Sequence, residues 1–188
     1  MYEITINMIG FRSKITIRVL NYYFLNPKKS HYVNELARIL DVDPANLFRK
    51  LIELEKEGVL VSETRGNQRY FSLNKKYPLL KELKKTFEAK YGVLNLIKER
   101  LSKLKGLKEA FIFGSFAKNA LSPESDIDIF LIGEHSSLEA KRLILPLEKM
   151  IGREINIIDM TEEELKKRKK RKDEFIKNVF SGKVIKIF

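Results

Sequence analysis

Two short groups of residues in the second half of the chain have the types and spacing needed for phosphate chemistry. Gly114 and Ser115 follow a short apolar stretch, and Asp126 and Asp128 open a second one eleven residues later. Because strand side chains alternate between faces, both carboxylates project the same way, with backbones about 6.6 Å apart. Like charges so close stay ionised together most readily when a hard cation such as Mg²⁺ lies between them. The pair therefore predicts a metal site.

The Gly114–Ser115 pair supplies the donors that the carboxylates lack. Glycine lets the backbone approach a phosphate closely, and amides at the start of a following helix donate to anionic oxygens. Ser115 adds a hydroxyl, and residues 121–125 read as a loop that returns the chain to the carboxylates. A phosphate-sized turn beside a metal site predicts a metal-bound nucleotide.

The elements that must position these groups are two strands, 110–113 and 126–132. A strand, Gly-Ser and then Asp-apolar-Asp resemble the signature of the DNA polymerase β-like nucleotidyltransferases. The sequences of 113–118 (FGSFAK) and 125–129 (SDIDI) are most similar to the minimal branch of that superfamily.

The resemblance implies a reaction and roles for particular residues. Gly114, Ser115 and Lys118 would bind the triphosphate of an NTP. Asp126 and Asp128 would be catalytic and would hold Mg²⁺ for attack on the α-phosphorus, with pyrophosphate leaving.

Family members commonly place a third acidic residue on a later strand, where it binds metal and takes the proton of the attacking hydroxyl. The closest match here puts Asn156 at that position, and an amide cannot act as a base. Glu154 lies two residues earlier on the same strand face and is the expected catalytic substitute. Asp159 has the opposite parity.

The first half of the chain predicts three helices and a hairpin. Apolar spacing places helices over 13–25 and 33–40, and Asp43 and Pro44 cap and open a third that runs to 57. Strands 59–63 and 69–73 follow, joined through 65–68.

This order resembles a winged helix-turn-helix domain of bacterial and archaeal transcription regulators. The resemblance implies that the third helix enters a DNA major groove while the hairpin contacts the backbone. The residues expected to contact double-stranded DNA lie near the helix start and on the hairpin: Ala45, Asn46, Arg49, Lys50, Arg65 and Arg69. The alternative is that these are ordinary solvated charges on a protein-binding winged helix.

Charge agrees with a nucleic-acid partner without requiring one. The net charge is +12, and seven consecutive basic residues occupy 166–172. Thr161 followed by Glu164 reads as a capping box that opens a helix, and basic residues toward its end complement the helix dipole. A solvated helix face is therefore the favoured interpretation of the basic run.

Between the two motifs, residues 79–104 predict one long amphipathic helix, or two broken near Gly92. Its apolar stripe would serve either as intramolecular core or as a homodimer contact. The predicted fold class is α+β: a winged helix-turn-helix over 1–77, a helical connector over 78–105 and a small mixed-sheet nucleotidyltransferase domain over 106–188.

Composition narrows the class of protein. The chain has no cysteine, which excludes disulfides and thiolate metal sites. No apolar run approaches the roughly 18 residues of a membrane span, and no signal peptide is evident, so we expect a soluble cytoplasmic protein without a membrane partner. The expected function is DNA binding combined with Mg²⁺- and NTP-dependent nucleotidyl transfer to a hydroxyl. The alternatives are a non-catalytic transcription regulator that senses nucleotide, or an antitoxin-like partner that binds another protein.

Overall fold

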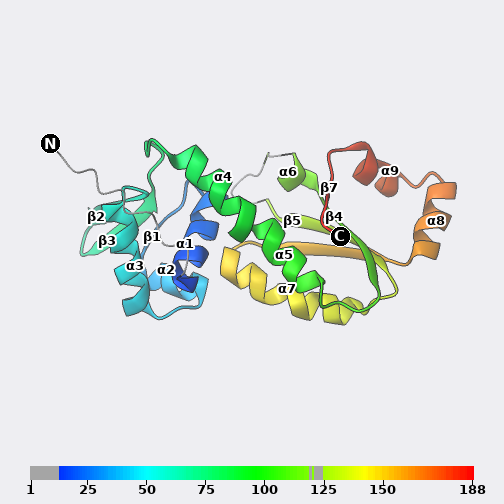
Figure 1. Ribbon diagram of the computed structural model, residues 1–188, viewed down its shortest axis with the longest axis horizontal. Helices are drawn as coiled ribbons and strands as arrows, with labels where there is room; N and C mark the ends of the chain where they lie inside the picture. The colour runs from blue at the N-terminus through cyan, green and yellow to red at the C-terminus, as the bar shows by residue number, and fades with distance from the viewer. Residues whose placement is uncertain (1–12, 119, 121–124) are drawn as a thin grey trace. The chain divides into compact units, whose positions relative to one another are not determined.

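The computed structural model describes residues 13–118, 120 and 125–188, and the chain divides into two units, 1–91 and 92–188 (Figure 1). The helical segment 78–105, predicted as a separate connector, is shared between them. It breaks at Gly92, which caps the second of two helices, α4 (Leu80–Tyr91) and α5 (Val93–Leu101). Phe87 of α4 is buried in the core of the first unit, and α5 contacts the second unit's helix α7.

The first unit contains the predicted helices and hairpin. The helices are α1 (Lys14–Leu25), α2 (Val33–Leu40) and α3 (Pro44–Lys56), and the strands of the hairpin are β2 (Leu60–Arg65) and β3 (Gln68–Leu73). Ser13 and Asp43 cap α1 and α3 through their side chains, as the sequence indicates for Asp43. An additional strand, β1 (Ser30–Tyr32), pairs with β3, which gives an antiparallel sheet in the order β1-β3-β2.

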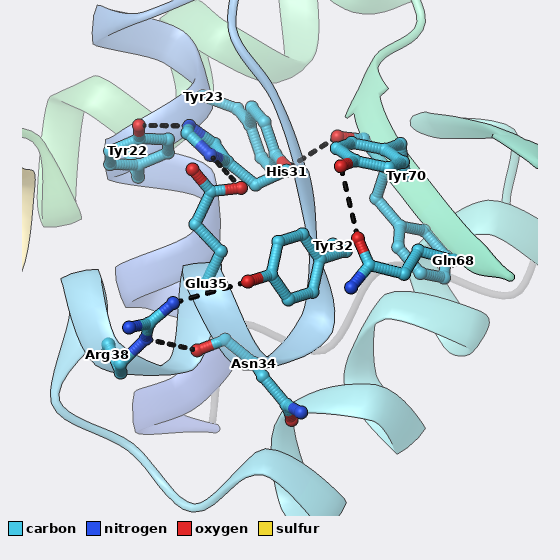
Figure 2. Close-up of polar contacts among 10 residues, drawn as sticks. Tyr22, Tyr23, His31, Tyr32, Asn34, Glu35, Arg38, Gln68 and Tyr70 are labelled. Atoms are coloured by element: carbon cyan, nitrogen blue, oxygen red, sulfur yellow. Dashed lines mark hydrogen bonds and ion pairs between the residues drawn. The ribbon is translucent and has the colours of Figure 1, made fainter. Parts of the chain in front are cut away.

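Buried polar contacts fix β1 between the helices (Figure 2). The Tyr22 hydroxyl and His31 Nε2 are hydrogen-bonded at 2.6 Å, and His31 Nδ1 lies 3.0 Å from a Glu35 carboxylate oxygen. Tyr23 donates to the Phe71 carbonyl at 2.7 Å, and burial raises the pKa of Tyr23. His31 is therefore a structural residue that joins β1 to α1 and α2.

The second unit is built on a four-stranded mixed sheet in the order β6-β5-β4-β7. Its strands are β4 (Leu107–Phe113), β5 (Ile127–Gly133), β6 (Ile155–Met160) and β7 (Ile185–Lys186). β5 and β6 run parallel, and the other neighbours run antiparallel. The helices are α5, the short α6 (Gly114–Ala117), α7 (Ser137–Ile151), α8 (Glu162–Lys170) and α9 (Glu174–Ser181).

The two faces of this sheet are covered by different helices. α7 contacts β6 and α5, while α8 and α9 supply Leu165, Ile176 and Val179 to a cluster with Phe111 and Phe130 on the opposite face (Figure 1). Asp128 has the same parity on β5 as Phe130, so its side chain belongs to the α8–α9 face.

Most of the elements predicted in the second half are present. The two motif strands are β4 and β5, and the capping box at Thr161 opens α8. Helix α7 is not among the predicted elements. Residues 121–124 of the predicted loop 121–125 lie outside the described residues. Within the described parts of the chain, no helix combines the length and apolar character needed to cross a membrane.

Candidate functional site

Three neighbouring strands bring the predicted site residues together. In the sheet register Phe113 of β4 lies opposite Asp128 of β5, and Asp128 lies opposite Asn156 of β6. Asp126 comes directly before β5. The Asn156 amide donates to Asp126 Oδ2 at 3.1 Å and to Asp128 Oδ1 at 3.5 Å. The amide thus bridges the two carboxylates and partly offsets their mutual repulsion.

The Gly-Ser turn is packed directly against the carboxylates. Gly114 has a φ of +71°, a conformation that favours glycine, and a Cβ at this position would overlap the Asp128 carboxylate. The two motifs therefore form one site, and a glycine is required where they meet.

The electrostatics of this site favour a cation. Burial raises the pKa of Asp128, and the nearby charge of Asp126 raises it further, while the hydrogen bond from Asn156 acts in the opposite direction. A positive charge beside both carboxylates would stabilise their ionised forms.

The residues present fit a Mg²⁺ ion, although three carboxylates do not converge. Among the described residues, no group of three His, Cys, Asp or Glu side chains is arranged to hold a metal. Two carboxylates form an all-oxygen donor set, and rotation of the Asn156 amide would add its carbonyl oxygen, the ligand type that Mg²⁺ prefers. Glu154 precedes β6 with an exposed side chain, and its carbonyl accepts the Ile127 N–H at 3.0 Å.

The other residues predicted to bind the nucleotide, Ser115 and Lys118, lie at the Gly-Ser turn. Ser115 is half-buried within α6, and Lys118 is the exposed C-cap residue of that helix. The Lys118 Cε lies 3.8 Å from the point that a Cβ would occupy at Gly182, so its side chain extends toward the end of α9.

Arg153 is a positioning residue that the sequence patterns did not single out. It is buried, and its guanidinium donates to the carbonyl of Ser125, the residue directly before Asp126. A lone arginine between Gly152 and a strand is a weak sequence signal, because surface arginines are common.

The first unit divides the predicted DNA-binding residues into two groups. The hairpin residues Arg65 and Arg69, together with Lys50, are paired within the molecule. Lys50 contacts Glu53 at 2.7 Å, Arg65 pairs with Glu63, and Arg69 bonds to Glu55 at 2.5 Å.

Of these acidic partners, Glu55 accepts hydrogen bonds from two side chains, Ser62 and Arg69. Its burial would raise the pKa, but the hydrogen bonds from Ser62 and Arg69, together with the Arg69 charge, lower it overall. Arg69 is therefore anchored to α3.

The positive charge at the start of α3 is less neutralised by acidic side chains than the charges of Lys50, Arg65 and Arg69. Ala45 and Asn46 are exposed, and the Asn46 amide oxygen accepts a hydrogen bond from Arg49. Among the described contacts, Arg49 has no acidic partner.

Comparisons with known proteins locate the family likeness in the second unit. Residues 94–181 match the family described as "Nucleotidyltransferase domain". A 55-residue stretch is 44% identical to a protein of Methanocaldococcus jannaschii named "Putative protein adenylyltransferase", and it covers 28% of this chain and 59% of that protein's length.

Two solved structures are similar to parts of this chain. A "toxin-antitoxin with AMP-PNP" has 17% identity and a TM-score of 0.40 over 51% of this chain and 73% of the other. A "putative nucleotidyltransferase from Sulfolobus solfataricus" has 27% identity and a TM-score of 0.27 over 42% of this chain and 71% of the other. The family match therefore locates the nucleotidyltransferase likeness in residues 94–181, within the second unit.

Proposed function

We propose that the second unit transfers a nucleotidyl group from an Mg²⁺-bound NTP to a hydroxyl on a protein acceptor. The observation that carries the proposal is the contact of Gly114 with Asp128 beside Asp126 and Asn156. The family match supports nucleotidyl transfer, and the name of the archaeal relative supports ATP and a protein as donor and acceptor.

The proposed reaction is a displacement at the α-phosphorus. The acceptor oxygen forms a new P–O bond, the bond to the β-phosphate breaks, and pyrophosphate leaves. Mg²⁺ held by Asp126 and Asp128 would neutralise charge on the phosphates. Gly114, Ser115 and Lys118 would hold the triphosphate.

The proton of the attacking hydroxyl needs an acceptor other than Asn156, because an amide is not a base. Glu154 is the proposed acceptor. It lies two residues from Asn156 with the same parity, and its exposed side chain can pass the proton to water.

Asp126→Ala tests the proposal. We expect it to lower transfer of α-phosphate label from ATP to the proteins of a cell extract by about 100-fold or more, because metal binding contributes several kcal/mol to such reactions. The exposed helix residue Glu139→Ala is the matched control and should transfer label at the wild-type rate. Equal transfer by Asp126→Ala, in a protein with an unchanged Tm, would sink the mechanism.

For the first unit we propose a winged helix-turn-helix that binds double-stranded DNA. The order α1-β1-α2-α3-β2-β3 with the sheet order β1-β3-β2 supports that interpretation, as do the exposed Asn46 and Arg49 at the start of α3. Ala45 lies beside them and Lys50 follows. Because Arg65 and Arg69 are paired with Glu63 and Glu55, they would contact phosphate only after those pairs open.

Arg49→Ala tests the DNA proposal. We expect its Kd for mixed genomic DNA fragments to rise about tenfold at about 0.1 M salt, with a salt slope that is shallower by about 0.9. Lys56→Ala, at the other end of α3, is the control and should change the Kd less than twofold. Binding that is weak and independent of salt in the wild-type protein would instead favour a protein-binding winged helix.

The two assays together separate the alternatives. Tight DNA binding with Mg²⁺-dependent ATP binding, but no pyrophosphate release, would favour a transcription regulator that senses nucleotide. Stable capture of a protein partner without transfer or DNA binding would favour an antitoxin-like role.

A further inference from the structure

Among the described residues, strand β6 forms an outer edge of the sheet next to the site. It is the outermost strand of the sheet order β6-β5-β4-β7. The Ile127 N–H bonds to the Glu154 carbonyl, so Glu154, Asn156 and the residues of that parity direct their main-chain groups toward β5. The residues of opposite parity, Ile155 and Ile157, direct theirs outward.

The outward direction is confirmed at Ile155. Its N–H donates at 2.8 Å to a carboxylate oxygen of Glu148, which comes from α7 and not from another strand. Ile157 presents its N–H and carbonyl to the same edge two residues later. A row of main-chain donors and acceptors at a sheet edge is a template for pairing with another strand.

A pocket of about 500 Å³ lies along this edge. Helix α7 contributes Leu138, Lys141, Arg142 and Leu145, and β6 contributes Asn156 and Ile157. Leu138 is 69% exposed and Leu145 is 54% exposed, so the helix side of the pocket offers apolar surface to a ligand. Asn156 belongs both to the pocket and to the bridge between Asp126 and Asp128.

The charges of the pocket select the kind of ligand. Lys141 and Arg142 are exposed, and neither takes part in an ion pair within the described residues. Among the described residues that line the pocket, the one acidic residue is Glu148, and its carboxylate accepts the Ile155 N–H. Two available cations beside apolar side chains and a strand edge are complementary to an extended segment that carries both acidic and apolar residues.

Strand addition would also direct a side chain to the site. Neighbouring strands lie about 4.8 Å apart, and residues of an added strand alternate between the two faces. A residue beside Asn156 on the face of Asp126 and Asp128 would therefore point toward the carboxylates.

We infer that the β6 edge and α7 dock an extended acidic segment of the acceptor protein, which adds to the sheet and presents a hydroxyl side chain to the site. The delivery of the hydroxyl rests on the proposed transfer function, whereas the docking itself does not. Acidic residues of the segment contact Lys141 and Arg142, and Ile157 supplies the main-chain pairing.

The test measures peptide binding by the full chain without NTP. The probes are two fluorescein-labelled peptides, one with alternating Glu and Val around a central Tyr, and one with Lys in place of Glu. We expect the acidic peptide to bind by fluorescence anisotropy. Lys141→Glu with Arg142→Glu should weaken it at least tenfold and improve the Lys peptide. The control Lys149→Glu, exposed on the same helix outside the pocket, should change binding less than twofold.

Two further measurements test whether the peptide adds to the sheet as a strand. Ile157→Pro removes an outward N–H from an edge strand, where proline is tolerated, and should weaken the acidic peptide at least tenfold with little change in Tm. In the wild-type protein, saturating acidic peptide should slow hydrogen exchange of the Ile157 amide at least tenfold. That readout does not depend on the folding of a variant.

Several outcomes would overturn the docking inference. These are equal binding of the two peptides, an Ile157 amide that gains no protection, or a Lys149→Glu effect as large as that of the double variant. Concentration-dependent self-association that Ile157→Pro abolishes would assign the edge to a second copy of this chain. The Asp126→Ala variant should bind the peptide normally, so its loss of label transfer cannot be attributed to a failed docking site. If the wild-type protein binds the peptide but transfers no label, the result counts only against the proposed function.

Discussion

At the scale of single residues, the site is defined by two carboxylates and the neutral amide between them. Asn156 donates to both Asp126 and Asp128, so it lowers their repulsion without supplying a charge. Burial and the Asp126 charge nevertheless raise the pKa of Asp128. Ionisation of Asp128 is therefore less favourable in the folded metal-free protein than in the unfolded chain.

This shift predicts how stability depends on pH. Because the folded pKa of Asp128 is raised above the ordinary value of 3.8, its favourable contribution is present below that value and is lost as the pH rises through the raised value. Asp128→Asn removes this titration. Without Mg²⁺ we expect the variant to match the wild type near pH 3.5 and to be the more stable of the two at pH 7, because the cost of ionising the half-buried Asp128, reduced by solvent screening, is removed.

Urea unfolding between pH 3.5 and 7 measures the difference. Glu139→Gln, which removes an exposed carboxylate on α7, serves as the control and should follow the wild-type curve. An Asp128→Asn variant that is less stable than the wild type at pH 7 would contradict the assignment.

At the scale of elements, the turn from β4 into α6 is the most constrained local structure. Gly114→Ala would place a Cβ against the Asp128 carboxylate as well as strain the backbone. We expect a loss of about 2–4 kcal/mol in the free energy of unfolding, from strain and overpacking together.

A matched glycine separates the two causes. Gly66 also has a positive φ, +58°, but a Cβ there would contact nothing within 4 Å, so Gly66→Ala reports the backbone cost alone. Asp128→Ala should restore part of the loss in Gly114→Ala, as a double-mutant cycle measures. An equal cost at both glycines would mean that the turn does not press on the carboxylate.

Some helices and strands could be predicted from local sequence signals, and others could not. Helices α1 and α3 carry capping residues and apolar spacing, and α8 carries a capping box, and all of these signals are local in sequence. Helix α7 contains Pro146 in its interior, which breaks the usual helical pattern, and β1 has three residues, too few for a periodic signal.

The basic run at 166–172 agrees with the favoured interpretation of a helix face. The capping box at Thr161 and Glu164 is present, Lys167 pairs with Glu163 at 2.7 Å, and Lys169 lies 5.0 Å from the centre of the Phe180 ring. These contacts explain part of the run through helix stability and packing.

At the scale of the whole molecule, the chain contains two units with separate cores. The core of the first unit extends into α4, whereas Ile97 and Leu101 of α5 are buried in the second unit. The boundary therefore falls at Gly92, where it divides the predicted connector.

This boundary predicts the behaviour of fragments. We expect residues 92–188 to unfold cooperatively on their own, with native-like near-UV circular dichroism. Residues 106–188 lack α5, so they should lose at least about 3 kcal/mol, the scale of deleting two fully buried apolar side chains. Equal stability of the two fragments would show that α5 is not part of the second core.

Local sequence patterns alone determined the pair of motifs, the elements that flank them and the residue types at the site. They placed Asp126, Asp128 and Gly114 at strand ends because strand parity and glycine conformation act over a few residues.

Only the tertiary structure decided which distant residues meet. The sheet order placed Asn156 across from Asp128, 28 residues away, and joined Gly114 to the same carboxylate. It also paired Arg69 with Glu55 and left the edge of β6 beside an open pocket. Such contacts depend on the order and register of strands, which are set by the packing of the whole core and not by neighbouring residues.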